Sequence, residues 1–123
     1  MKIQNHRDLI VWRKAMDVAM QVFEVTKTFP VEERYSLTDQ MRRASRSVAA
    51  QIAEGWRRRR YRAAFVNKFS EAEGEAAEMQ THIEIALRCG YLKSEIAAEL
   101  DCAYEEIIAM LVSISKNVDK WTP

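Results

Sequence analysis

Apolar side chains recur every three or four residues through four segments of this 123-residue sequence, at about residues 8–28, 37–56, 61–89 and 94–119. This spacing is the period of an α-helix, whereas a half-buried strand alternates every second residue. The stretches between the segments are short, so consecutive helices are expected to lie side by side and run in opposite directions. The sequence therefore predicts an all-α protein with a single domain spanning residues 1–123, folded as an up-down-up-down antiparallel four-helix bundle.

Composition supports this class and narrows the cellular setting. Three glycines and two prolines leave little material for the tight turns of a β-sandwich or barrel. No run approaches the roughly 20 apolar residues of a membrane span, and the first residues lack the apolar stretch of a secretory signal. Cys89 and Cys102 form no CxxC pair and suit free thiols in a reducing compartment. We therefore expect a cytoplasmic protein with no membrane partner.

One apolar stripe of each predicted helix is expected to face the core of the bundle. In chain order, the four stripes are Leu9, Trp12, Met16, Met20 and Phe23; Leu37, Met41, Ala44, Val48 and Ile52; Phe65, Phe69, Ala72, Ala76, Met79, Ile83 and Leu87; and Ile96, Leu100, Ala103, Ile107, Met110, Ile114 and Val118.

A second apolar stripe lies on roughly the opposite side of the first predicted helix, and the fourth helix has a wide apolar sector that includes Ala97 and Tyr104. Contiguous exposed apolar patches usually mark interfaces, although a bundle helix sometimes buries more than half of its circumference. We therefore expect the protein to associate with itself. The predicted oligomer interface consists of Val11, Ala15, Val18, Val22, Val25, Ile108 and Val112.

Charge is nearly balanced in total but unevenly distributed along the chain. The formal net charge is +1, yet residues 34–68 hold ten basic and two acidic side chains, whereas residues 69–123 hold four basic and eleven acidic ones. Such a dipolar molecule is suited to an anionic partner at its basic pole, or to an assembly in which the two poles of different copies meet.

The strongest functional signal is a run of four arginines between Trp56 and Tyr61, followed by a fifth arginine, Arg62. Arginine presents a planar fork of donors that matches phosphate oxygens, and aromatic rings stack on unpaired bases. The predicted phosphate contacts are Arg42, Arg43, Arg46, Arg57, Arg58, Arg59, Arg60 and Arg62, with Trp56 and Tyr61 as stacking partners. The alternative is a solvated loop whose charges pair with the glutamates of residues 71–78 or with a neighbouring subunit.

Residues suited to catalysis are sparse. His6 and His82 stand alone, Cys89 and Cys102 lack a recognised metal-ligand spacing, and the sequence has no Glu-x-x-His motif, glycine-rich phosphate loop or nucleophile elbow. Glu54 is expected to pair with a nearby arginine rather than act as a base. We therefore predict no catalytic residue, no metal site and no cofactor, and thus a protein that is not an enzyme.

Five blocks, taken together, resemble the bacterial four-helix bundle proteins: residues 8–15 (DLIVWRKA), 29–37 (FPVEERYSL), 40–44 (QMRRA), 52–55 (IAEG) and 87–92 (LRCGYL). That family includes products of intervening sequences in large ribosomal RNA genes and the accessory variability determinants of diversity-generating retroelements. The resemblance implies a four-helix bundle that assembles as a ring-like homopentamer. For the retroelement branch it also implies a basic surface that engages RNA and a reverse transcriptase.

The sequence departs from the family pattern at Gln51, where asparagine is usual, and at Arg46, where a small or apolar residue is common. The segment after Gly55 carries arginines where the family often has a serine or threonine cap. The leading expectation is an oligomeric, non-catalytic accessory protein that binds RNA or DNA. The alternatives are a protein-interaction scaffold without nucleic-acid binding and an enzyme with a site between subunits.

Overall fold

The computed structural model of the protein describes residues 2–122, which form four helices and three short 3-10 turns. The helices are α1 (Ile10–Thr26), α2 (Leu37–Arg57), α3 (Arg62–Arg88) and α4 (Ser94–Lys116), and the 3-10 turns are η1 (His6–Asp8), η2 (Val31–Glu33) and η3 (Val118–Lys120). Each helix packs on the next, and α4 packs back on α1. The predicted all-α four-helix bundle is confirmed.

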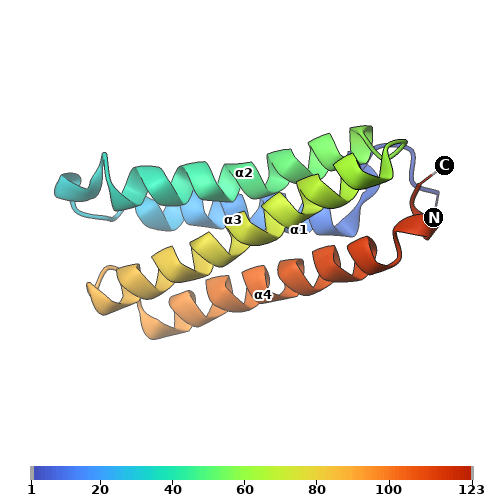
Figure 1. The fold of residues 1–123 in the computed structure, drawn as a ribbon. Coiled ribbons are helices and arrows are strands. Elements are labelled where there is room, and N and C mark those ends of the chain that lie inside the picture. Colours follow the sequence, from blue (N-terminus) through green and yellow to red (C-terminus); the bar gives the residue numbers. More distant parts are fainter. Residues whose placement is uncertain (1, 123) are drawn as a thin grey trace.

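Both chain ends lie at the end of the bundle where α2 turns into α3 (Figure 1). The four helices run side by side along their length, and the two other connections lie at the far end. In residues 2–122, no helix combines the length and the apolar character that crossing a membrane requires.

The far end of the bundle is held by local hydrogen bonds of two kinds. Gly90 takes a φ of +79°, and the N–H groups of Gly90 and Tyr91 donate to the carbonyls of Leu87 and Ala86, which is the Schellman ending of a helix. The first N–H of α2 donates to the carboxylate of Glu33. Ser36, the residue before α2, also donates its hydroxyl to that carboxylate, at 2.6 Å.

Gly55 has a different role from the helix-ending glycine that its position indicates. It is buried inside α2 with an ordinary helical φ, and a Cβ there would lie 2.7 Å from Cδ1 of Phe69 and 3.2 Å from Cβ of Lys68. Lys68 also forms an ion pair with the carboxylate of Glu54, at 3.0 Å. Gly55 therefore lets α2 and α3 approach closely beside this ion pair.

The core agrees with the predicted stripes of the second, third and fourth helices. Met41, Val48 and Ile52 of α2 are fully buried, as are Phe69 of α3 and Ile107 of α4. Four predicted core residues are only half-buried: Leu87, Ile96, Ala103 and Met110. Burying these stripes supplies the apolar area that drives the helices together.

Four members of the predicted oligomer interface lie in the core instead, so the prediction is wrong for them, and of the α1 stripe predicted to face the core only Leu9, just before the helix, is buried. Val11, Ala15, Val18 and Val22 are at most 2% exposed in the core, and the remaining three predicted interface residues, Val25, Ile108 and Val112, are half-buried. The core side of α1 is thus formed by compact valine and alanine side chains. The larger side chains lie outside, with Met16 36% and Met20 54% exposed.

Candidate nucleic-acid interface

The connection between α2 and α3 gathers arginines at one end of the bundle. The N–H of Arg58 still donates to the carbonyls of Glu54 and Gly55, which ends α2. The N–H of Tyr61 then donates to the carbonyl of Arg58 at 2.9 Å, and α3 begins at Arg62. Because side chains leave a tight turn in different directions, the arginines spread over this end of the molecule instead of following one helix face.

Three of these guanidinium groups are available to a ligand. Arg57, Arg58 and Arg60 are exposed, and none of them forms an ion pair within residues 2–122. The Arg60 guanidinium lies 6.0 Å from the centre of the Tyr61 ring, and Tyr61 is 65% exposed. We name these four residues, Arg57, Arg58, Arg60 and Tyr61, the arginine turn. It combines cations for phosphates with an exposed ring for a base.

The glutamates that follow in α3 do not neutralise the arginine turn. The ammonium group of Lys68 forms ion pairs with the carboxylates of Glu54, at 3.0 Å, and Glu71, at 3.3 Å. These contacts raise the pKa of Lys68. The carboxylate of Glu78 lies 3.4 Å from Nε2 of His82. The expected pairing of Glu54 with an arginine is therefore wrong, because Lys68 faces α2 at the level of Glu54 and reaches it first.

Trp56 is not a stacking platform for nucleic acid. It is only 4% exposed, because Trp121 packs edge-on at 6.2 Å and the guanidinium of Arg59 covers its ring at 4.0 Å. Arg59 also donates to the carbonyl of Trp56 at 2.9 Å. Arg62 forms an ion pair with Asp119 of the C-terminal segment. Arg59 therefore covers Trp56 and Arg62 holds the C-terminal segment, which leaves the arginine turn as the free part of the run.

The three arginines predicted earlier in α2 do not join the arginine turn. Arg42 is half-buried and its Nε donates to Oγ1 of Thr26 at 2.9 Å, which ties α2 to α1. Arg43 lies 3.8 Å from Asp39 on the outside of α2. At 1.5 Å per residue, Arg42 lies about 22 Å along the helix from its last residue. Arg46 lies between these positions and is exposed.

Lys120 and His6 also lie near the arginine turn, a placement that the sequence did not predict. Lys120 lines a shallow hollow beside Arg59, where the C-terminal segment folds back over the end of the bundle. Burial, together with the charges of Arg7 and Arg57, lowers the pKa of His6. The tryptophan after Lys120 is the sequence signal that the C-terminal segment folds back onto the bundle, because such a large apolar side chain is usually buried.

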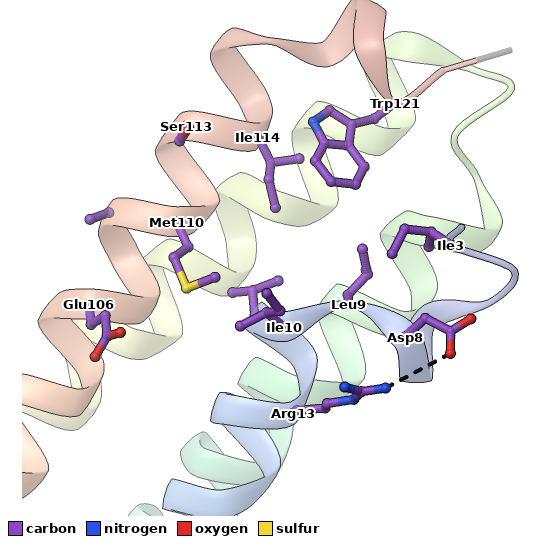
Figure 2. A pocket seen from close by; sticks show the side chains of 12 residues that line it. Ile3, Asp8, Leu9, Ile10, Arg13, Glu106, Met110, Ser113, Ile114 and Trp121 are labelled. Atoms are coloured by element: carbon purple, nitrogen blue, oxygen red, sulfur yellow. Dashed lines mark ion pairs between the residues drawn. The ribbon is translucent and has the colours of Figure 1, made fainter. Parts of the chain in front are cut away.

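A pocket of about 640 Å³ lies elsewhere, between α1 and α4 (Figure 2). Its lining is mainly apolar and includes Leu9, Ile10, Met110, Ile114 and Trp121. The charged groups near it are paired, Arg13 with Asp8 at 3.9 Å and Lys14 with Glu106 at 2.8 Å. Within residues 2–122, no three His, Cys, Asp or Glu side chains gather in a way that could hold a metal ion.

The fold and this surface define a class: small all-α four-helix bundles with an arginine-rich end. The sequence model of the family described as 23S rRNA-intervening sequence protein matches residues 7–113, and the chain belongs to that family. The predicted resemblance to ribosomal RNA intervening-sequence proteins is thus confirmed.

A solved structure of similar fold is a protein of unknown function from the S23 ribosomal protein family of Bacteroides thetaiotaomicron. It is 27% identical in sequence and superposes with a TM-score of 0.78, with 87% of this chain and 96% of that chain covered. The search of curated proteins found no significant match.

Proposed function

We propose that this protein is an oligomeric, non-catalytic accessory protein that binds RNA through the arginine turn. The observation that carries the proposal is the absence of ion pairs, within residues 2–122, at three neighbouring exposed guanidiniums beside an exposed tyrosine. Guanidinium forks bind phosphates, and each neutralised phosphate releases counterions without any reading of sequence. The family's link to 23S rRNA favours RNA over DNA as the ligand.

Self-association into a ring-like homopentamer is part of the proposal. A ring would present one arginine turn per subunit and raise the affinity for a long RNA through avidity, without new contacts. A reverse transcriptase is the protein partner expected if the chain acts in a retroelement. The proposed location is the cytoplasm, where the exposed free thiols of Cys89 and Cys102 stay reduced.

The test is binding of a labelled single-stranded RNA and a labelled RNA hairpin, measured by fluorescence anisotropy across salt concentrations. The wild-type protein should bind at low salt and lose affinity steeply as salt rises. The triple variant Arg57→Gln, Arg58→Gln, Arg60→Gln should bind at least about tenfold more weakly. Its salt slope on the single strand should be shallower by about 2, because each phosphate contact contributes about 0.7.

A matched control exists at the opposite end of the bundle. Arg34 lies 5.8 Å from the ring of Tyr35, which is 86% exposed, so this pair has the same chemistry as Arg60 and Tyr61. Arg34→Gln should leave RNA binding unchanged. Equal binding by the wild type and the triple variant would assign RNA to another surface. A lack of binding even at low salt would favour the protein-interaction scaffold instead.

A further inference from the structure

The reversed orientation of α1 leaves an apolar groove between α1 and α2 on the outside of the bundle. Its α1 wall carries Trp12, Met16 and Met20, and its α2 wall carries Ala49, Ala50 and Ala53. The groove has a volume of about 600 Å³. Two methionines at least one-third exposed, beside a row of alanines, form a surface that a second helix can approach closely.

The groove is bordered by positive charge along α2. Arg46 lines it directly, and Arg57 lies on the same face eleven residues later, at a distance of about 16 Å along the helix. His6 lines the end of the groove near Arg57 and feels its charge. A helix that docks here should therefore be small or apolar along its contact stripe and carry acidic groups with a similar spacing.

One face of α4 matches this description. Ala98 and Cys102 line a shallow hollow between Glu95, Glu99 and Glu106. Glu95 and Glu106 are eleven residues apart, which repeats the spacing of the two arginines of α2. Glu95 and Glu99 form no ion pair within residues 2–122, and Glu106 pairs with Lys14 at 2.8 Å while its side chain stays 55% exposed. Charge and spacing are thus complementary between the two surfaces.

The two surfaces lie on different sides of the molecule, since α2 packs on α1 and α3 while α4 packs on α3 and α1. We propose that the groove receives the α4 face of a second copy of this chain, with Glu95 and Glu106 of that copy opposite the two arginines that border the groove. A contact between two different surfaces is head-to-tail, and it closes into a ring when the rotation between subunits allows. This inference rests on the self-association included in the proposed function.

RNA is the less suitable occupant of this groove. The lining is mainly methionine and alanine, which offer no flat surface for a base, and Trp12 is half-buried with its edge against His6 at 5.2 Å. An acidic, small-residue helix gains from both the apolar lining and the basic border, whereas RNA gains only from the border.

A disulfide between copies gives a direct test. In a Cys89→Ser background, Ala50→Cys should form a disulfide with the native Cys102 of a neighbouring copy under mild oxidation, giving a ladder of linked species on a non-reducing gel. Cys102 is exposed and suits this use. Ala77→Cys places a thiol at an exposed position of α3 and should give no ladder with Cys102. Equal or absent linking in the two variants overturns the inference.

Charge reversal tests the same contact without a cross-link. Arg46→Glu and Glu106→Arg should each reduce the molar mass measured by light scattering, and the double variant should restore it. Oligomers that persist in Arg46→Glu and in Met20→Glu overturn this contact but leave self-association intact. A monomeric wild type overturns both. Loss of RNA binding in Met20→Glu with unchanged mass overturns the inference in favour of RNA in the groove.

Discussion

Gly55 shows how a single residue sets the distance between two helices. A methyl group there would lie within 2.8 Å of two ring carbons of Phe69, and Phe69 is fully buried with its ring edge-on to Phe65 at 4.7 Å. Neither ring has room to move, because core side chains are packed at crystal density. The close approach of α2 and α3 just before the arginine turn therefore depends on this glycine.

Gly55→Ala should lower the free energy of unfolding by about 1–3 kcal/mol, since overpacking outweighs the gain of about 1 kcal/mol in helix propensity. The control is Gly74→Ala, also within a helix, where an added Cβ meets nothing within 4 Å. That variant should be stabilised by about 0.5–1 kcal/mol. Urea unfolding measures both, and a Gly55→Ala protein as stable as the wild type would contradict the argument.

The hydroxyl of Tyr91 donates to Glu33 at 2.9 Å and joins the α3–α4 connection to the start of α2. The carboxylate raises the pKa of Tyr91 to about 12 from its ordinary value of 10. The hydroxyl of Ser36 and that of Tyr91 lower the pKa of Glu33. The contact thus favours the neutral tyrosine and the ionised glutamate.

The pH dependence of stability follows from the raised pKa of Tyr91 and the lowered pKa of Glu33. The tyrosine contribution is complete below pH 10 and is lost as pH rises toward the raised pKa of about 12. The glutamate contribution is complete above the ordinary value of 4.5 and is lost as pH falls through the lowered pKa. Tyrosinate absorbance compared between the wild type and Tyr91→Phe measures the alkaline step. Ionisation of Tyr91 near pH 10 would refute it.

At the scale of the element, α1 separates what sequence can predict from what it cannot. The spacing of apolar residues defines the helix to within two residues at each end, because period is a local property. The same spacing yields two apolar stripes and does not say which one faces inward. That choice depends on the gap between helices, which the neighbouring elements set. The stripe predicted from spacing to face the core is therefore the one that the structure leaves mostly outside.

A matched pair of charge insertions tests the observed face of α1. Val18→Asp places a carboxylate at a position 2% exposed and should cost about 3 kcal/mol or more of the free energy of unfolding. Met20→Asp alters a position 54% exposed and should change stability by only about 0.5 kcal/mol at low protein concentration. Thermal unfolding distinguishes the two. The reverse order of stabilities would restore the original prediction.

The arginine run likewise has features that the sequence predicts and others that it does not. Composition indicates an electropositive segment, and the structure leaves Arg57, Arg58 and Arg60 free as that indication requires. Sequence proximity does not reveal that Trp56 is covered by Trp121, because the two are 65 positions apart and meet only once the bundle is complete. Local sequence patterns do not predict contacts that form when a chain end folds back onto a distant part of the chain.

At the scale of the whole molecule, the arginine turn and the apolar groove share α2. The helix ends in the arginine turn and carries one wall of the groove, so a copy docked in the groove would engage Arg57 and leave Arg58, Arg60 and Tyr61 uncovered at the end of the bundle. In a ring, every subunit would then present these remaining cations on the same side. Assembly and RNA binding are thus coupled mainly through avidity.

Met20→Glu should therefore weaken binding to a long RNA that spans several subunits, while binding to an RNA short enough for one arginine turn stays unchanged. The loss on the long RNA should approach 10²-fold or more, about the gain that linking of sites provides. Val31→Glu is the control, because it puts the same charge on an exposed residue, 80% accessible, outside the groove. Anisotropy titrations with both RNAs measure the effect. Equal losses on the long and the short RNA would place Met20 in the RNA contact, since avidity leaves a single site unaffected.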